Sequence, residues 1–203
     1  MDDIIRQIVL LWTVIDPIGT VPVFLAVTSH LSEAAERRAI AGKATVIAAL
    51  VLLFFVVAGE ILLEAMNIPL PAFQVAGGVV LFLFALSMIF GRSKPEEEVG
   101  LAQSAAHSAV FPLAIPSIAS PGAMMAAVLL TDNHRFSLAD QAITSLIILS
   151  ILLVTWVLML AAVRIHKLIG EAGASVISRV MGLILSAVAM NAVLSGIATY
   201  FAF

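Results

Sequence analysis

Apolar residues in this chain fall in six long runs and do not alternate with polar ones as they do in half-buried strands. The runs are bounded by charged or turn-forming residues and cover 4–28, 40–63, 71–91, 108–131, 140–163 and 178–202. A helix needs roughly 20 apolar residues to cross the hydrocarbon core of a bilayer, so each run is long enough to span it. The pattern predicts an all-α polytopic membrane protein in which residues 1–203 form a single domain of six transmembrane helices.

Composition excludes several other classes of protein. The chain is 62% hydrophobic and 11% charged, whereas soluble domains are about 45–50% apolar and about 25% charged. It has no cysteine, which excludes disulfides and cysteine-based metal sites, and its net charge of −3 without a basic block argues against a nucleic-acid partner. The N-terminus carries two acids and no cleavage signal, so we interpret it as the first span and not as a signal peptide.

Basic residues indicate how the spans are oriented. Eight of the ten lysines and arginines lie in or flank the links after the first, third and fifth runs, and only Arg6 and Arg135 lie on the other side. The eight are Arg37, Arg38, Lys43, Arg92, Lys94, Arg164, Lys167 and Arg179. Because basic residues near span ends are retained in the cytoplasm, we expect a multi-pass protein of the cytoplasmic (inner) membrane with both termini on the non-cytoplasmic side.

The two halves of the chain resemble each other. A shift of 104 residues aligns Pro17 with Pro121, and a shift of 105 aligns Gly77 with Gly182. These matches predict a first repeat over about 1–91, a polar loop over about 92–107 and a second repeat over about 108–203. Since each repeat has three spans, the second enters the bilayer from the opposite face. The expected architecture is a 3+3 inverted repeat, which is common in secondary transporters.

Prolines interrupt the first and fourth spans. Five of the eight prolines in the chain fall within these two runs: Pro17, Pro22, Pro112, Pro116 and Pro121. Proline inside a helix removes a backbone hydrogen bond, and lipid offers no water to replace it. We therefore predict that helices 1 and 4 are broken.

Each predicted break has the local chemistry of a helix start. Asp16 and Ser120 are good N-cap residues and directly precede Pro17 and Pro121, and proline is favoured at the first helical position. With the spans running in opposite directions, both new N-termini would point into the middle of the bilayer, where their N–H groups suit a carboxylate. Prolines also kink helices for packing alone, but the matched positions in both repeats favour a binding site.

The predicted substrate-binding residues surround the two breaks, where glycines allow close approach of a backbone or a small ligand. They are Asp16, Pro17, Ile18, Gly19, Thr20, Ser117, Ala119, Ser120, Pro121, Gly122 and, from the sixth span, Asn191. Asp16 is the only acid near the middle of a span. It can cap the half-helix, bind a substrate ammonium or carry a proton. The other polar residues can alternatively form interhelical hydrogen bonds.

Enzyme signatures are missing from the sequence. There is no HExxH, GxSxG or P-loop motif, and the four histidines lie near span ends or in links. We expect neither catalysis nor a metal site nor a cofactor. A coupling ion, Na⁺ or H⁺, stays open.

Several segments together resemble the MarC family of bacterial and archaeal inner-membrane proteins. They are LLWTVIDPIGTVPVFLAVT, AGE at 58–60, QVAGGVVLFLFALSMIFG, FPLAIPSIASPGAMM and SRVMGLILSAVAMNAVLSGI. The resemblance covers essentially the whole chain. It implies a six-span, inverted-repeat transporter of small neutral amino acids such as glycine and alanine, the activity of the SnatA-type members.

The sequence therefore favours a secondary transporter of a small zwitterionic amino acid that works by alternating access. Two alternatives stay open: an exporter of amino acids or related metabolites, and a non-transporting membrane partner protein. The oligomeric state is not predicted by any feature of the chain.

The distribution of basic residues makes a direct prediction about topology. A reporter fused to the C-terminus that is active only in the cytoplasm should stay inactive, and one that is active only outside should work. The opposite pair of results would invert the orientation.

Overall fold

A computed structural model describes residues 2–29, 31, 33–90 and 109–201. In these residues the elements are all helical: α1 (Asp2–Ile15), α2 (Pro17–Val27), α3 (Ala34–Ala65), α4 (Leu70–Phe90), η1 (Ala109–Ile118), α7 (Pro121–Leu129) and α8 (Leu138–Tyr200). The predicted polar loop 92–107, with Arg92 and Lys94, lies outside the described residues.

The helices confirm an all-helical polytopic membrane protein. Five of them are long and apolar enough to span a bilayer: Ile4–Val27, Ala34–Ala65, Leu70–Phe90, Leu138–Leu168 and Ser175–Tyr200. A sixth span results if η1 and α7, which are bent by 54° at the break between them, are counted as one. These segments match the six predicted apolar runs, with shifts of a few residues at their ends.

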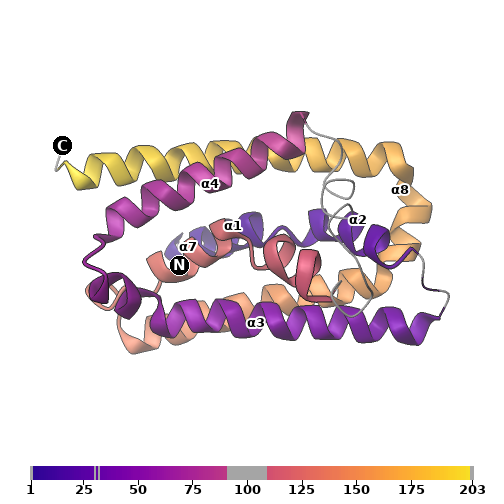
Figure 1. Cartoon of the computed structure of the whole chain (residues 1–203), viewed down its shortest axis with the longest axis horizontal. Coiled ribbons are helices and arrows are strands. Elements are labelled where there is room, and N and C mark those ends of the chain that lie inside the picture. The colour runs from indigo at the N-terminus through magenta and orange to yellow at the C-terminus, as the bar shows by residue number, and fades with distance from the viewer. Residues whose placement is uncertain (1, 30, 32, 91–108, 202–203) are drawn as a thin grey trace.

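The interrupted helices lie at the centre of the bundle. In Figure 1, α4 and the C-terminal part of α8 lie along one side, α3 and the N-terminal part of α8 lie along the other, and α1, α2, η1 and α7 lie between them. Burial agrees, because 61% of the most apolar window in Ile4–Val27 is buried against 17–33% in the other four helices. The breaks are therefore shielded from lipid by the rest of the chain.

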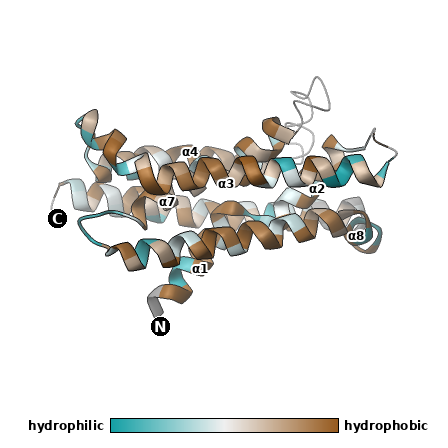
Figure 2. Ribbon diagram, turned by 90° about the horizontal axis from the view of Figure 1, so that it is seen from below, coloured by the Kyte–Doolittle hydropathy of each residue, from teal (hydrophilic) through white to brown (hydrophobic). Residues whose placement is uncertain are grey.

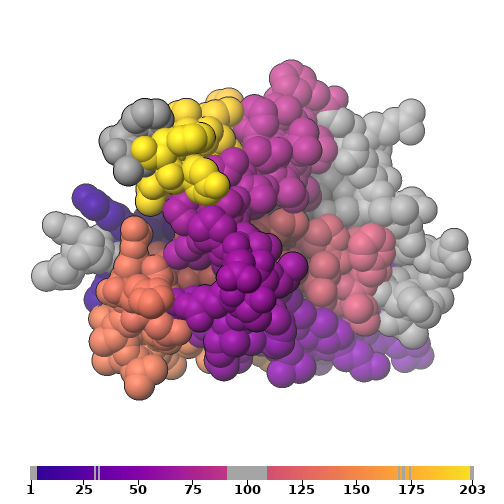
Figure 3. All heavy atoms as spheres, turned by 60° about the vertical axis from the view of Figure 1, so that its left-hand side comes forward, coloured from indigo at the N-terminus to yellow at the C-terminus, as the bar shows by residue number. Residues whose placement is uncertain are grey.

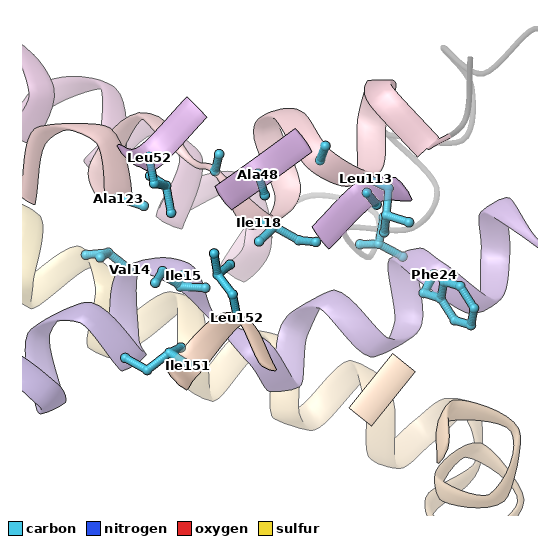
Figure 4. Packing of buried hydrophobic residues seen from close by; sticks show 14 of the residues in the cluster. Val14, Ile15, Phe24, Ala48, Leu52, Leu113, Ile118, Ala123, Ile151 and Leu152 are labelled. Carbon is cyan, nitrogen blue, oxygen red and sulfur yellow. The ribbon is translucent and has the colours of Figure 1, made fainter. Parts of the chain in front are cut away.

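The buried core is built around the two breaks. Val14 and Ile15 at the end of α1 lie near Ile118 at the end of η1, with Leu52 of α3 and Leu152 of α8 on either side (Figure 4). The outer helices keep many apolar side chains exposed, among them those of Val57, Leu83 and Leu153. Hydrophilic residues gather at the ends and links of the helices (Figure 2). This is the pattern of a bundle with lipid around it, where exposed apolar side chains meet hydrocarbon.

The link between the fifth and sixth spans is helical and not the expected loop. α8 continues from Leu138 to Tyr200 and is interrupted only at Gly170, whose backbone has φ 65° and ψ 178°. Residues 164–177 contain no proline, so the helix continues into this link, and glycine supplies the left-handed φ at which the chain reverses. The reversal is visible as the orange turn of α8 in Figure 1.

The first half of the fourth span is not the α-helical half-helix that we expected. η1 has wide i→i+5 turns, with extended backbone at Phe111 and Ile115 and cis peptide bonds before Pro112 and Pro116. Two prolines within ten residues each lack an N–H, which prevents a continuous i→i−4 ladder. The last wide turn closes with the Ala119 N–H donating to the Ala114 carbonyl at 2.8 Å.

α4 and the C-terminal part of α8 pack backbone to backbone at two glycines. A Cβ added to Gly78 would lie 3.0 Å from the Ala189 carbonyl oxygen, and one added to Gly182 would lie 2.9 Å from the Ala85 carbonyl oxygen. Gly78 and Gly182 are 104 residues apart, and so are Ala85 and Ala189. The two contacts are thus the same contact with the roles of the helices exchanged.

These contacts predict that alanine is poorly tolerated at either glycine. Gly78→Ala and Gly182→Ala should each destabilise the protein by about 1–3 kcal/mol, because a methyl group would press on a backbone carbonyl that cannot rotate away. Gly42→Ala is the matched control, since a Cβ there would meet only the Trp156 indole nitrogen at 3.9 Å. Thermal unfolding in detergent measures the difference. Equal stability of the three variants would contradict the close packing.

Candidate functional site

The first break is centred on Asp16, between α1 and α2. Asp16 has the left-handed conformation (φ 51°, ψ 65°) and is 1% exposed. Its carboxylate oxygen Oδ1 accepts a hydrogen bond from the Gly19 N–H at 2.9 Å, and Pro17 begins the new helix. The predicted N-cap is confirmed. Thr20 adds a second local bond, donating from its hydroxyl to the Asp16 carbonyl at 3.0 Å.

Gly19 leaves room for the Asp16 side chain. A Cβ at this position would collide with the Asp16 carboxylate, whose Cγ would lie only 2.6 Å away. We expected this glycine to admit another backbone or a ligand. In this conformation the group that approaches is the capping carboxylate itself, so glycine is needed for the cap to form.

The second break is centred on Ser120, between η1 and α7. The Ser120 hydroxyl accepts a hydrogen bond from the Ala123 N–H at 3.0 Å, and Pro121 begins α7, so this predicted cap is confirmed as well. Ser120 is 1% exposed, and Ala119 before it is completely buried. Gly122 admits the side chain of Leu81 from α4, because a Cβ there would lie 2.6 Å from the Leu81 Cδ1.

One hydrogen bond joins the two breaks. The Ser120 hydroxyl donates to the Val14 carbonyl at 2.7 Å, across 106 residues of sequence. In an uninterrupted helix this carbonyl would accept from the N–H of residue 18, but the left-handed turn at Asp16 ends α1 before that bond can form. Ser120 thus caps its own helix and satisfies a carbonyl that the other break exposes.

The positive ends of two helices face this junction. α2 and α7 begin at the breaks and lead away from them in opposite directions (Figure 1). The caps take the N–H groups of Gly19 and Ala123, and the first residue of each helix is a proline without an N–H. The N–H groups of Ile18 and Gly122 remain as first-turn donors that neither cap engages, and the helix dipoles add to their attraction for an anion.

Ser117 adds an uncompensated polar group near the second break. Its hydroxyl is 1% exposed and has no hydrogen-bond partner in the described part of the chain. Leaving a buried hydroxyl unsatisfied costs about 1–3 kcal/mol, so such a group is a candidate for binding a ligand. By contrast, the Thr13 hydroxyl donates to the Val9 carbonyl within α1 at 2.7 Å.

The structure thus brings the predicted residues of the two breaks together. The remaining predicted residue, Asn191, does not lie with them. Eight of them are buried, namely Asp16, Pro17, Gly19, Thr20, Ser117, Ala119, Ser120 and Gly122, whereas Pro121 is half-buried and the Ile18 side chain is exposed. Asn191 lies on α8 with an exposed side chain. It therefore does not share the enclosed environment of the breaks.

Three polar residues lie close together at one end of the bundle. The sequence did not predict that they would meet. Glu60 and Glu64, one turn apart on α3, meet His134 from the link between α7 and α8. The His134 Nε2 lies 3.5 Å from Glu60 Oε1 and 3.4 Å from Glu64 Oε1. The three side chains offer ligand atoms close enough to hold a metal ion. His134 and Glu64 are exposed, so an ion pair between these two side chains contributes little to stability, whereas the Glu60 side chain is only 13% exposed.

Asp132 is a further acid at this end of the bundle that the sequence did not identify as a candidate site residue. It follows Leu130 and Thr131, the two residues after α7, and it is only 4% exposed. Its position in the sequence was a signal, because Asp132 comes directly after an apolar run. At that depth, the neighbouring helices decide whether a side chain is buried. Its neighbour Asn133 donates its N–H to Glu60 Oε2 at 2.7 Å, which ties this link to α3.

The double role of Ser120 predicts an unusually large effect of its removal. Ser120→Ala should cost about 1 kcal/mol for the lost cap and a further 1–3 kcal/mol for the unsatisfied Val14 carbonyl. Ser137→Ala is the matched control, because Ser137 caps α8 at an exposed position and accepts from the Asp140 N–H. Thermal unfolding in detergent compares the two. An equal loss in both variants would show that the bond to Val14 contributes nothing.

Comparison with known proteins agrees with these features over the full chain. The model of the MarC family integral membrane proteins matches residues 1–201. The UPF0056 inner membrane protein YhgN of Escherichia coli is 34% identical over 197 residues, which are 97% of each chain. The UPF0056 membrane protein of Archaeoglobus fulgidus is 31% identical over 194 residues, 93% of this chain and 89% of the relative. No solved structure matches the chain. The protein therefore belongs to the MarC family of integral membrane proteins.

Proposed function

We propose that the protein is a secondary transporter that moves small neutral amino acids of the glycine and alanine class across the cytoplasmic membrane by alternating access. The observation that carries the proposal is the hydrogen bond from Ser120 to the Val14 carbonyl, which joins two helix breaks at the buried centre of the bundle. Broken helices with opposed N-termini near mid-membrane are a recurrent device for binding anionic groups in transporters. The name of YhgN, an inner membrane protein, supports the location.

An inverted repeat of three plus three spans supports alternating access. The two caps, Asp16 and Ser120, are 104 residues apart, and the exchanged glycine contacts between α4 and α8 follow the same shift. The half-helices also end alike, since the hydroxyls of Thr28 and Thr131 each donate to the carbonyl four residues earlier at 2.7 Å. Two similar repeats in opposite orientation can exchange conformations, which opens a central site to either side in turn.

The chemistry at the breaks fits a small zwitterion. Its carboxylate would accept hydrogen bonds from the N–H groups of Ile18 and Gly122 at the positive ends of α2 and α7. Its ammonium would lie toward the Asp16 carboxylate, and the Ser117 hydroxyl would supply a further partner. The bonds that close the centre, from Ser120 to Val14 above all, would have to lengthen when the substrate enters. We propose a binding role and no catalytic role for these residues.

Reconstitution tests the proposal directly. Purified protein in proteoliposomes should accumulate labelled glycine or alanine, with larger neutral and charged amino acids as comparisons. Imposed sodium and proton gradients, each applied in both directions, identify the coupling ion and the direction of net transport. Absence of glycine and alanine flux under every gradient, with folded protein in the vesicles, would overturn the proposal.

A charge-neutral cap separates the structural role of Asp16 from its role toward the substrate. Asp16→Asn should keep the fold, because asparagine caps helices as well as aspartate does. Loss of a charged partner for the ammonium should raise KM roughly ten- to hundredfold. If Asp16 also carries the coupling proton, uptake by the variant loses its pH dependence. A wild-type KM in a folded Asp16→Asn variant would remove Asp16 from the site.

A further inference from the structure

A polar cavity lies away from the breaks, at one end of the bundle. It has a volume of about 270 Å³ and lies between the start of α4, the link after α7 and the C-terminal end of α8. Its polar lining comes from Gln74, Asp132, Arg135, Ser195 and Thr199, and apolar residues of α4 and α7 complete the wall. Figure 3 shows this end of the molecule, where the links from α3 to α4 and from α7 to α8 lie near the C-terminal turns of α8.

Opposite charges lie side by side in this cavity. Asp132 is 4% exposed, and its Oδ1 accepts a hydrogen bond from the His134 N–H at 2.8 Å. Its other oxygen, Oδ2, lies 3.6 Å from the Arg135 Nε, which is too far for a direct hydrogen bond. The Arg135 side chain is 66% exposed. The carboxylate is therefore fixed by the backbone, while the guanidinium can turn toward another anion.

The link that carries both charges is tied to α3 and closed by a turn of its own. Glu60 of α3 accepts the Asn133 N–H at 2.7 Å, and the Asp132 carbonyl accepts the N–H groups of Arg135 and Phe136 at 3.0 and 2.9 Å. These bonds hold residues 132–136 as a compact turn. The backbone positions that carry the two charged side chains are thus set by the fold.

We propose that this cavity is an entry site that binds the amino-acid zwitterion before it reaches the breaks, an inference that rests on the proposed transport function. Asp132 binds the ammonium and Arg135 binds the carboxylate, each in place of the loose contact that the two side chains make with each other. Gln74, Ser195 and Thr199 offer further hydrogen bonds. The volume suits a small molecule, since one water occupies about 30 Å³ in the liquid.

The position of the cavity fits a first step of uptake. The distribution of basic residues predicts that this end of the bundle lies on the non-cytoplasmic side. Helix α7 begins at the second break and ends at Leu129, which lines the cavity. Nine residues of α-helix span about 13 Å, so the cavity and the break are separate sites at the two ends of α7.

Transport kinetics test the entry site. Asp132→Asn keeps an acceptor for the His134 N–H, and Arg135→Gln keeps a polar side chain, so both variants should fold. Each should raise the KM for alanine at least tenfold and leave the maximal rate within twofold of the wild type. Glu64→Gln is the control, because Glu64 lies at the same end, is exposed and does not line the cavity. A wild-type KM, or a loss of maximal rate at unchanged KM, would overturn the entry site.

A binding measurement that needs no transport accompanies the kinetics. The chain has no cysteine, so Ser195→Cys introduces a single thiol in the cavity wall. Alanine should slow its labelling by a membrane-impermeant maleimide, and ethylamine, which lacks the carboxylate, should not. Ala65→Cys, exposed beyond the cavity, should be labelled at the same rate with and without alanine.

The two experiments separate the failure of the entry site from that of the proposed function. Transport by the wild type together with unprotected Ser195→Cys would overturn the entry site alone. Absence of transport together with unprotected labelling would overturn both. Protection of Ser195→Cys without transport would support a zwitterion site in the cavity and overturn the transport function.

Discussion

The constraint on which this structure depends is that every backbone polar group inside a bilayer needs a partner supplied by the protein. Two prolines at helix starts and a left-handed Asp16 break the ladders of hydrogen bonds in the first and fourth spans, and each break exposes donors and acceptors. Two short side chains satisfy three of these groups. Asp16 caps α2, and Ser120 caps α7 and also binds the Val14 carbonyl. The central position of the breaks follows, because only neighbouring helices can cover such groups.

Local chemistry made the caps predictable, and long-range packing decided the rest. The Asp-Pro and Ser-Pro pairs predict helix starts from sequence alone, and long apolar runs predict membrane spans. The bond from Ser120 to Val14 could not be predicted, since it joins residues that only the folded bundle brings together. The wide turns of η1 were not predicted, because the pattern of single prolines indicates separate interruptions. Pro112 and Pro116 instead act on the same turns. The helical conformation of the link after Arg164 was not predicted. Charged residues are typical of loops, but several of them are also good helix formers.

Burial separates residues that a one-dimensional pattern treats alike. Asn191 and Asp16 are both polar residues within apolar runs, yet Asn191 is exposed on α8 and Asp16 is enclosed. Asp132 shows the opposite case, because it follows the end of a run and is nonetheless buried. Whether a polar side chain near the membrane is enclosed depends on which helix packs beside it, and that information is spread over distant parts of the chain.

Under the proposed transport function, the joined breaks at the centre and the polar cavity at the end of α7 are two places where a charged ligand can bind. At the breaks, the caps engage the N–H groups of Gly19 and Ala123, and the Ser120 hydroxyl binds the Val14 carbonyl, so a substrate must open this junction before it can bind the remaining first-turn donors. In the cavity, the opposite charges of Asp132 and Arg135 are only loosely paired, so a zwitterion displaces a weaker contact. We therefore expect a zwitterion to bind more easily at the end of the bundle than at its centre. A substrate held at one end of α7 can then bias the packing of the helix whose other end forms the break. In the proposed order of events the entry site would provide selectivity, and the opening of the junction between the breaks would provide the barrier that keeps the membrane sealed when no substrate is bound.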